Sequence, residues 1–346
     1  MSASTPSPSS EEIALAVAAL EAGELVAMPT ETVYGLAADA TSPEAVGRIF
    51  DAKGRPRKHP VIVHLGDASW MARWAAEITP EAEALAEAFW PGPMTLIVPR
   101  GPAAHDGVTG GRPTVGLRVP GHPVALALVQ AFGRGVAAPS ANRFGRVSPT
   151  EAAHVAAELG DRVSVILDGG PCDVGVESTI VDLTGPKARV LRPGHVTPEA
   201  LGAVLGYVPD AGPVVVEGNA GEAPGTLASH YAPRAGVYLL PRGALAQAAL
   251  EDYIGAGEAV AVYARCGRPS DLPEAIIWRR APDSPRQYAQ QLYATLRALD
   301  EAGVDSILVE TPPEHPQWQA IADRLSRAAA PRMHSQASPP GEQETS

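Results

Sequence analysis

Short apolar runs alternate with segments of helical periodicity along most of this chain. Runs such as residues 25–28 and 60–64 are too short for helices and consist largely of apolar residues, which is typical of buried strands. Between them, apolar residues recur at the spacing of a helical face, as at Val46, Ile49 and Phe50. Helices and strands that alternate in this way predict an α/β fold with a sheet of mixed strand direction.

The length of the chain predicts two domains. At 346 residues it exceeds the usual size of one domain, and each half is long enough to bury its own core. We predict a disordered head, a first α/β domain, a linker, a smaller doubly wound α/β domain and a disordered tail, over residues 1–10, 11–206, 207–235, 236–330 and 331–346. A linker of that length without regular structure is either disordered or functional.

Composition narrows the possible functions. The formal net charge of -12 argues against non-specific binding along nucleic acid, which needs a broad basic face. The two cysteines, Cys172 and Cys266, lie far apart and give neither a disulfide framework nor the C-x-x-C spacing of a zinc site. The sequence shows no signal peptide and no apolar run long enough to cross a bilayer, so we expect a soluble protein of the reducing cytoplasm with no membrane partner.

A cluster of basic residues interrupts this acidic sequence. Five positive side chains fall within eleven residues, opposed only by Asp51: Arg48, Lys53, Arg55, Arg57 and Lys58. The cluster lies between a helical pattern and the strand at residues 60–64, so we place it on a helix-to-strand loop. Such a run is either a solvated basic turn or an anion site. The polar segment at residues 30–32 follows another strand, and ligand groups often lie at strand ends, which favours the anion site.

The familiar catalytic motifs are absent from the sequence. It has no Walker P-loop, no G-x-S-x-G elbow and no H-E-x-x-H or other metal-spaced histidine cluster. The remaining polar candidates are scattered, and each alone is weak evidence. His64 ends an apolar strand and is either a satisfied core histidine or a ligand. Arg118 lies inside the apolar strand at residues 115–119, and a buried guanidinium needs an anionic partner, which is either structural or a substrate carboxylate.

Taken in order, several sequence blocks resemble the YrdC-like family in its long, two-domain form. The blocks are PTETVYGL at 29–36, K-x-R at 53–55, PVIVH at 60–64, FWPGPMTL at 89–96, VGLRVPGHP at 115–123, APSAN at 138–142, SPT at 148–150, DGG at 168–170, ESTIVDL at 177–183, LRPG at 191–194 and HYAP at 230–233. Many blocks in one order are far more specific than any single motif.

The resemblance implies a fold and an activity. The first domain would be a twisted mixed sheet with a central cationic cavity, followed by a smaller doubly wound, Rossmann-like α/β domain. The implied enzyme is a nucleotidyltransferase that converts L-threonine, bicarbonate or carbon dioxide, and ATP with Mg²⁺ into threonylcarbamoyl-AMP and pyrophosphate. A separate transferase complex would move the threonylcarbamoyl group to the adenosine beside the anticodon of tRNA, so stable nucleic-acid binding by this chain is not expected. Anionic substrates would explain a cationic cavity in an acidic protein.

The resemblance also implies roles for residues at the matching positions. The threonine side would consist of Thr32, His64, Arg118, Ala138 and Ser178, with Arg118 on the substrate carboxylate. The ATP side would consist of Arg55, His59, Thr114, Ser140, Ser148, Arg192 and Tyr231. The implied catalytic group, which holds the phosphates, is Lys53, Arg55 and Asn142. A free carbamate loses carbon dioxide readily in water, so the site should close, and we predict that the linker 207–235 with Tyr231 is a lid.

Two other functions stay open at this point. A non-catalytic RNA-binding module could use the same basic concavity, although the acidic net charge argues against it. The other is a carbamoyl-adenylate-forming relative of the hydrogenase-maturation type, but such relatives carry zinc-finger modules that two isolated cysteines cannot build. Residues 236–330 show no catalytic constellation, and we predict that the second domain is a regulatory or docking body.

Overall fold

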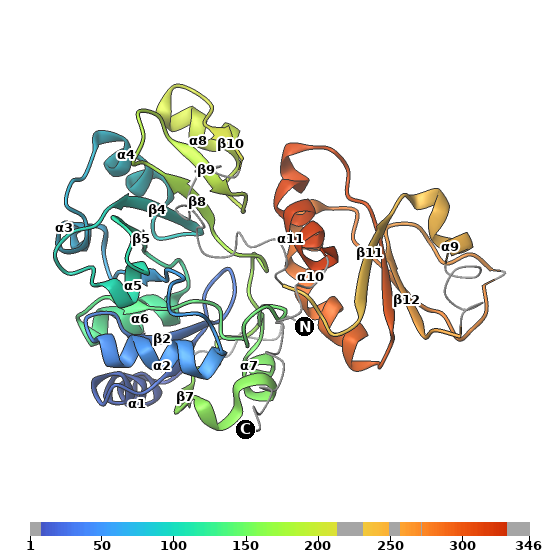
Figure 1. Ribbon diagram of the computed structural model, residues 1–346, viewed down its shortest axis with the longest axis horizontal. Coiled ribbons are helices and arrows are strands. Elements are labelled where there is room, and N and C mark those ends of the chain that lie inside the picture. The colour runs from blue at the N-terminus through green and yellow to red at the C-terminus, as the bar shows by residue number, and fades with distance from the viewer. Residues whose placement is uncertain (1–7, 213–230, 249–256, 271, 331–346) are drawn as a thin grey trace, which may run out of the picture.

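The computed structural model describes residues 8–212, 231–248, 257–270 and 272–330 (Figure 1). Within this part, ten strands of the first domain form one sheet: β1 Val26–Met28, β2 Gly35–Asp39, β3 Ile62–His64, β4 Met94–Pro99, β5 Thr114–Arg118, β6 Val136–Ala137, β7 Val165–Ile166, β8 Thr179–Asp182, β9 Arg189–Arg192 and β10 Asp210–Ala211. Their order across the sheet is β10-β9-β8-β4-β5-β3-β6-β2-β1-β7. Strands β3 and β5 run parallel, whereas β4 and β5 run antiparallel, so the predicted mixed direction is confirmed.

Helices cover both faces of this sheet. With two 3₁₀ turns, at Ala68–Trp70 and Gly160–Arg162, they are α1 Ser10–Glu21, α2 Pro43–Lys53, α3 Met71–Trp74, α4 Pro80–Phe89, α5 Asp106–Thr109, α6 Pro123–Phe132, α7 Ala152–Leu159 and α8 Pro198–Leu205. Residues of one strand alternate between the two sides. Val26 and Met28 of β1 pack in the apolar cluster of α1 and α6, whereas Ala27 packs in the cluster that contains Ile49 of α2. The central strands are therefore buried on both faces.

Two features of the first domain differ from the sequence-based predictions. Strand β2, with the sequence GLAAD, gives no strand signal, because all five residues are buried and none is β-branched. The placement of the basic cluster on a loop is wrong for Arg48 and Lys53, which lie within α2. That helix continues to Gly54, whose φ of 63° is the left-handed conformation that ends helices and that glycine adopts without a steric penalty.

The second domain contains a four-stranded parallel sheet within the residues that the structure describes. Its strands are β11 Gly236–Leu240, β12 Val260–Ala264, β13 Ile277–Arg280 and β14 Ser306–Glu310, in the order β11-β14-β12-β13. Its helices are α9 Leu245–Ala248, α10 Pro285–Glu301 and α11 Gln319–Ala329, with 3₁₀ turns at Arg242–Ala244 and Pro316–Trp318. Val260 and Val262 pack with Leu245 of α9, whereas Ala261 and Tyr263 pack with α10 and α11. Helices on both faces confirm the predicted doubly wound arrangement.

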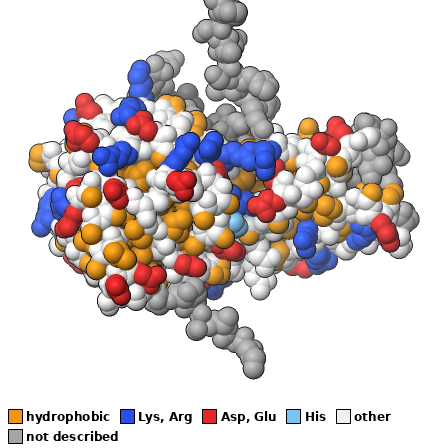
Figure 2. Space-filling view, turned by 90° about the horizontal axis from the view of Figure 1, so that it is seen from below, with side chains coloured by type: hydrophobic (Ala, Val, Ile, Leu, Met, Phe, Trp, Pro, Cys, Tyr) orange, Lys and Arg blue, Asp and Glu red, His pale blue; other side chains and the backbone are white. Residues whose placement is uncertain are grey.

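The two domains are packed together through α10 and α11, which lie on the side of the parallel sheet that faces the first domain (Figure 1). Ion pairs cross this junction. Arg297 of α10 pairs with Glu158 of α7 at 2.6 Å, and Arg146 pairs with Asp300 of α10 at 3.2 Å. In Figure 2, Lys and Arg side chains gather in a band that runs toward the junction. A protein of net charge -12 thus presents a basic zone where its domains meet.

Some predictions fall on segments outside the described residues. Residues 1–7, 213–230 and 331–346 are among them, so disorder of the head and tail, and a lid function for the linker, stay predictions. The end of the predicted head differs from the structure, because Ser9 caps α1, and Ser10 begins it. The start of the predicted linker also differs, because Asp210–Ala211 form β10, which pairs with β9 in the sheet of the first domain. No helix in the part of the chain described above combines the length and the apolar composition that a membrane span requires.

Candidate active site

Several strands of the large sheet end around one cavity of about 50 Å³. His64 ends β3 and Arg118 ends β5. Because these two strands are parallel and the two residues are paired in register, their side chains come together at one edge of the sheet. Arg192 ends β9 and also lines the cavity. The lining therefore joins cationic and polar groups that lie far apart in the sequence.

Most of the predicted site residues lie in this lining. On the threonine side, all five do: Thr32, His64, Arg118, Ala138 and Ser178. On the ATP side, Arg55, Ser140, Arg192 and Tyr231 do. Outside the lining lie Lys53, His59, Thr114, Asn142 and Ser148. The structure thus brings the predicted residues together, while the ligand that each of them contacts stays a prediction.

Arg118 has a protein partner. Its Nη2 donates to Oε1 of Glu31 at 2.6 Å, and its Nε donates to the carbonyl oxygen of Gly92 at 3.1 Å. Burial would raise the pKa of Glu31, but the charge of Arg118 and its hydrogen bond outweigh burial, and the pKa is lowered. Glu31 is therefore the structural partner that the sequence left open. A guanidinium carries five N–H donors, more than these two bonds use, so Arg118 can serve a second anion in the cavity.

His64 is buried at the wall of the cavity. Its Nδ1 has no hydrogen-bond partner among the described residues, and the side chain lines the cavity. Burial, followed by the positive charge of Arg118, lowers the pKa of His64 to about 3. The imidazole is therefore neutral near pH 7. It can offer a hydrogen bond to a ligand but not a positive charge.

We expect this neutral histidine to make the protein sensitive to acid. Between about pH 6.5 and about pH 3 the unfolded chain binds a proton on His64 that the folded protein does not, so the free energy of unfolding falls as the pH is lowered through this range. Urea unfolding at about pH 7.5 and about pH 5 measures the effect, and His64→Gln should reduce the difference between the two values by about 2 kcal/mol. An equal difference in the variant and the parent protein would contradict a neutral His64.

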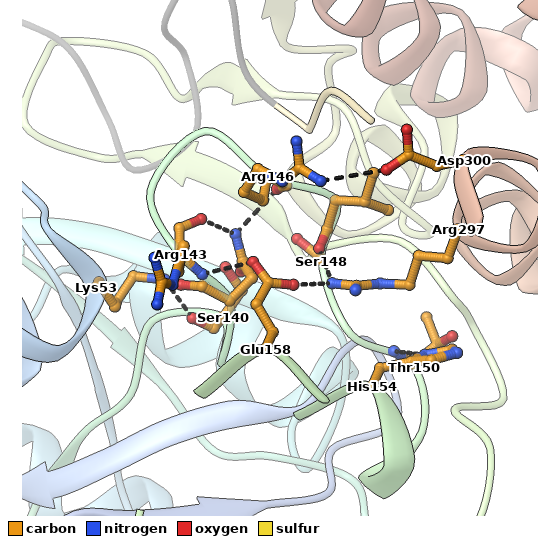
Figure 3. A network of polar contacts seen from close by, with 12 residues as sticks. Lys53, Ser140, Arg143, Arg146, Ser148, Thr150, His154, Glu158, Arg297 and Asp300 are labelled. Carbon is orange, nitrogen blue, oxygen red and sulfur yellow. Dashed lines mark hydrogen bonds and ion pairs between the residues drawn. The ribbon is translucent and has the colours of Figure 1, made fainter. Parts of the chain in front are cut away.

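Lys53 joins the end of α2 to the loop with the S-x-N signature. Its Nζ donates to the carbonyl oxygen of Ser140 at 2.6 Å and to that of Asn142 (Figure 3). Burial, followed by the charge of Arg55, lowers the pKa of Lys53 well below its usual value. The ammonium group is thus engaged with the backbone of the loop, outside the cavity lining. A phosphate contact for Lys53 stays a prediction.

The basic cluster does not form one anion site. Arg55 is the member of the cluster that lines the cavity. Arg48 donates to the carbonyl oxygen of Gly23 at 2.7 Å, and Arg57 pairs with Asp51 at 2.8 Å on the surface. The predicted anion site is therefore wrong in extent, because backbone carbonyl groups engage Arg48 and Lys53, an acidic group engages Arg57, and Lys58 lies outside the cavity lining. Within the cluster, only the guanidinium group of Arg55 reaches the cavity.

Three other predicted residues lie near the cavity or on the strand that leads to it. Asn142 donates through Nδ2 to two backbone carbonyl oxygens of the following loop, at 2.8 and 2.9 Å, and its buried Oδ1 has no partner in the described part of the chain. His59 packs edge-on against Phe144, with 5.4 Å between ring centroids. Thr114 begins β5 and lies about 13 Å along the strand from Arg118. Nucleotide contacts of these residues stay predictions.

Ser178 and Arg192 are held as a pair in the cavity wall. Arg192 donates through Nε to the carbonyl oxygen of Ser178 and through Nη2 to its Oγ, both at 3.0 Å. The hydroxyl groups of Ser178 and Thr95 are also hydrogen-bonded, at 2.8 Å. These contacts cross from the loop before β8 to the end of β9 and to β4. The position of Ser178 therefore depends on three strands of the sheet.

Glu177 is a cavity residue that the sequence does not single out. Ser148 donates to its Oε1 at 2.6 Å, which places the predicted ATP residue Ser148 directly behind the lining. Burial would raise the pKa of Glu177, but the charges of Arg324 and Arg192 outweigh burial and lower it to about 2. The carboxylate is therefore ionised. Its partner Arg324 lies 147 residues away, so the only local signal is an acidic residue directly before an apolar strand.

Tyr231 brings the end of the predicted linker into the cavity. It is 1% exposed and has a φ of 63°, a conformation that non-glycine residues rarely adopt. Such a backbone persists only where surrounding contacts fix it. The ring of Tyr293 lies 5.8 Å from that of Tyr231, and the guanidinium of Arg324 lies 5.4 Å from the centre of the Tyr231 ring. Burial raises the pKa of Tyr231 to about 12. Side chains of the second domain therefore hold this tyrosine at the wall of the cavity.

Known families match both domains of this chain. The family model Sua5_yciO_yrdC, described as "Telomere recombination", matches residues 18–194. The model described as "Threonylcarbamoyl-AMP synthase, C-terminal domain" matches residues 196–330. The threonylcarbamoyl-AMP synthase of Pyrococcus abyssi is 39% identical over 93% of this chain and 95% of its own length. The enzyme of the same name from Bacillus subtilis is 39% identical over 93% of this chain and 94% of its own length.

A solved structure matches over a similar share of this chain. The crystal structure of P. abyssi Sua5 complexed with L-threonine gives a TM-score of 0.84 at 38% identity, over 92% of this chain and 94% of that chain. The similarity spans both domains and confirms the resemblance drawn from the sequence blocks. This chain therefore belongs to the threonylcarbamoyl-AMP synthase family, in its two-domain form.

Proposed function

We propose that this chain forms L-threonylcarbamoyladenylate and pyrophosphate from L-threonine, bicarbonate or carbon dioxide, and ATP, for the threonylcarbamoyladenosine modification of tRNA. The observation that carries the proposal is the 39% identity over 93% of the chain to an enzyme named threonylcarbamoyl-AMP synthase. A relative that was crystallised with L-threonine supports threonine as the amino acid. A downstream threonylcarbamoyl transferase would consume the product. We expect the reaction to take place in the cytoplasm, where ATP and tRNA are present.

The proposed chemistry has two steps. The threonine nitrogen bonds to the carbon of carbon dioxide and loses a proton, which gives a carbamate. A carbamate oxygen then bonds to the α-phosphorus of ATP, while the bond to the bridging oxygen of the β-phosphate breaks and pyrophosphate leaves. In this proposal Arg118 binds the threonine carboxylate, and Arg55 and Arg192 bind phosphate oxygens. Fixed guanidinium groups stabilise the charge that develops on the phosphates without having to reorient.

Thr32 offers the cavity a hydrogen-bond acceptor. The hydroxyl of Thr30 donates to the carbonyl oxygen of Val33 at 2.6 Å, which uses its only proton. The hydroxyl groups of Thr30 and Thr32 are 2.8 Å apart, so Thr32 must be the donor in that bond. Lone pairs of the Thr32 oxygen are then available at the cavity wall. A threonine hydroxyl that donates to this oxygen would be selected by the hydrogen bond and not by shape alone.

We expect Thr32→Val to weaken threonine binding selectively. Valine keeps the shape of the side chain but removes the acceptor, so KM for threonine should rise about tenfold, as for the loss of one buried hydrogen bond. KM for ATP should stay unchanged, and Thr32→Ser, which keeps the hydroxyl, should stay close to the parent protein. Steady-state pyrophosphate release measures both constants.

The choice among amino acid substrates by the parent protein tests the same hydrogen bond of Thr32. Serine lacks one methyl group and should be rejected by about 10–200-fold, whereas valine lacks the hydroxyl and should be rejected more strongly. Comparable turnover of valine and threonine would contradict a hydroxyl-binding role for Thr32.

Mg²⁺ enters this proposal as part of the nucleotide substrate. It prefers phosphate oxygens, carboxylates and water, and commonly reaches such sites on the triphosphate of ATP. Among the described residues, no three His, Cys, Asp or Glu side chains converge on one point. We therefore assign the phosphates, and no set of protein side chains, as the main ligands of this ion.

One experiment tests the proposed function against the two alternatives. The protein is incubated with L-threonine, bicarbonate and labelled ATP, and pyrophosphate is measured. We expect release that depends on both threonine and bicarbonate. A carbamoyl-adenylate-forming relative would release pyrophosphate without threonine only when a carbamoyl donor such as carbamoyl phosphate is added in a parallel incubation. An RNA-binding module would release none in either incubation but would bind tRNA in a salt-dependent way. Neither alternative is favoured, because relatives that match nearly the whole chain are named as synthases.

A further inference from the structure

The second domain packs directly behind the wall of the cavity. Val33 and Val176 of the first domain are buried in the same apolar cluster as residues of α10 and α11. At Gly175, where φ is +80°, an added Cβ would lie 2.4 Å from the Cα of Gln290 in α10. No side chain fits at that distance, so the two backbones come into direct contact there. The loop that leads into β8 is therefore seated on the second domain.

Two side chains of the second domain hold the carboxylate of Glu177. Arg324 of α11 donates through Nε to Oε2 at 2.6 Å, and the hydroxyl of Tyr293 in α10 donates to the same oxygen at 2.9 Å. On the other side, Ser148 of the first domain donates to Oε1 at 2.6 Å. The side chain of Arg324 is 0% exposed and also pairs with Asp323 at 2.6 Å. Both carboxylate oxygens are thus held by hydrogen bonds. Oε2 is held from the second domain, and the hydroxyl of Tyr293 also lies 3.2 Å from Oε1.

The negative charge of Glu177 acts on any ligand of the cavity, because Glu177 is part of the cavity lining. It is the one carboxylate among the described lining residues, which also include the guanidinium groups of Arg55, Arg118 and Arg192. A buried carboxylate would repel a triphosphate in the same cavity unless a cation compensates it. Arg324 lies outside the lining. It can therefore neutralise Glu177 without occupying an arginine that the substrates need.

We propose that Arg324 and Tyr293 are positioning residues of the reaction, which act on the nucleotide through Glu177. They keep the carboxylate compensated and directed toward Ser148, so that Arg192 keeps its hydrogen bonds to Ser178 at the cavity wall, where phosphate would bind. The second domain then completes the active site of the first, and is not only a regulatory or docking body. This inference rests on the proposed function, because it assigns the cavity to ATP.

The test measures nucleotide binding and turnover in the full chain. Arg324→Met removes the cation that compensates and orients Glu177, so Kd for a nonhydrolysable ATP analogue and KM for ATP should both rise about tenfold or more. KM for threonine should change by less than about twofold, because Arg118 forms its ion pair with Glu31 and not with Glu177. In the double variant Arg324→Met with Glu177→Gln, the carboxylate is gone. Its Kd and KM should return to within about threefold of Glu177→Gln alone.

Arg297→Met is the matched control. The pair of Arg297 with Glu158 is also a largely buried ion pair across the domain junction at 2.6 Å, but neither residue lines the cavity. Arg297 also donates to the carbonyl oxygen of Val147, next to Ser148, so this variant should lower Tm and change Kd and KM for the nucleotide by less than about twofold. Tyr293→Phe removes a single hydrogen bond from Glu177 and should raise KM for ATP about two- to fivefold. If Arg324→Met does not fold, Tyr293→Phe measured against Arg297→Met decides the question.

Three results would overturn the inference. The first is an unchanged Kd and KM for the nucleotide in the folded Arg324→Met protein, or in Tyr293→Phe where that variant decides. The second is an equal effect of Arg297→Met, and the third is a double variant that does not recover. Binding of the analogue is read without turnover. If the parent protein binds the analogue but releases no threonine-dependent pyrophosphate, the proposed function is refuted. The Kd values of the variants can still be compared in that case.

Discussion

Arg118→Gln is expected to lower kcat/KM for threonine by about 10²–10³-fold, because a charge-assisted contact to the substrate carboxylate is lost and a second charge is left buried without its partner. That second charge is Glu31, whose Oε1 lies 2.6 Å from the Arg118 guanidinium. An uncompensated buried carboxylate costs about 3–5 kcal/mol, so the variant should also unfold at a lower temperature. KM for ATP should change little. Steady-state kinetics and thermal unfolding measure the two effects separately.

The double variant Arg118→Gln with Glu31→Gln separates binding from stability. With both charges removed, the Tm should recover most of its loss, since neither buried charge is then uncompensated. Threonine turnover should stay low, because the cation that we assign to the substrate carboxylate is still missing. If turnover recovers together with Tm, the role of Arg118 is structural. Its anionic partner would then be Glu31 alone, and not the substrate carboxylate.

The elements that the sequence predicts are those with a clear pattern. Helix α2 and strand β3 follow from apolar spacing, and the doubly wound second domain follows from the alternation of apolar runs with segments of helical periodicity. Strand β2 was missed for a physical reason. It is buried on both faces between two layers of helices, so its five residues show no alternation between apolar and polar side chains. Its content of alanine also fits a helix better than a strand.

The residues of the candidate site were grouped by the resemblance to the family and not by their local sequence. Taken alone, the sequence places His64, Arg118 and Ser178 only on separate strands, and it does not show that β3 and β5 are paired and parallel. The compensation of charge in the cavity was not predictable. Arg324 is separated from Glu177 by 147 residues and lies on a helix of the other domain. No local pattern relates two such residues, because only the packing of one domain on the other brings them together.

The two basic residues of the K-x-R block are expected to differ sharply when each is replaced by methionine. Arg55 is buried, lines the cavity and pairs with no carboxylate among the described residues. Burial lowers the pKa of Arg55 to about 10, which marks a cation that an anionic ligand would stabilise. Arg55→Met should therefore reduce kcat/KM for ATP by about 10²–10³-fold, as for the loss of one fixed donor at a developing charge. Arg55→Met loses one hydrogen bond, from Nη2 to the carbonyl oxygen of Pro60 at 2.9 Å, and also a buried cation, so Tm should change less than in Lys53→Met.

Lys53→Met should instead affect mainly stability. The ammonium of Lys53 donates to the carbonyl oxygens of Ser140 and Asn142, and both bonds are lost in the variant. A buried carbonyl group left without a donor costs about 1–3 kcal/mol of stability. We expect this loss to exceed the stability gained by removing a buried cation. Urea unfolding should detect this loss, while kcat/KM for ATP falls by less than in Arg55→Met. If Lys53→Met instead abolishes ATP turnover at unchanged stability, Lys53 contacts the phosphates directly, and its bonds to the loop are secondary.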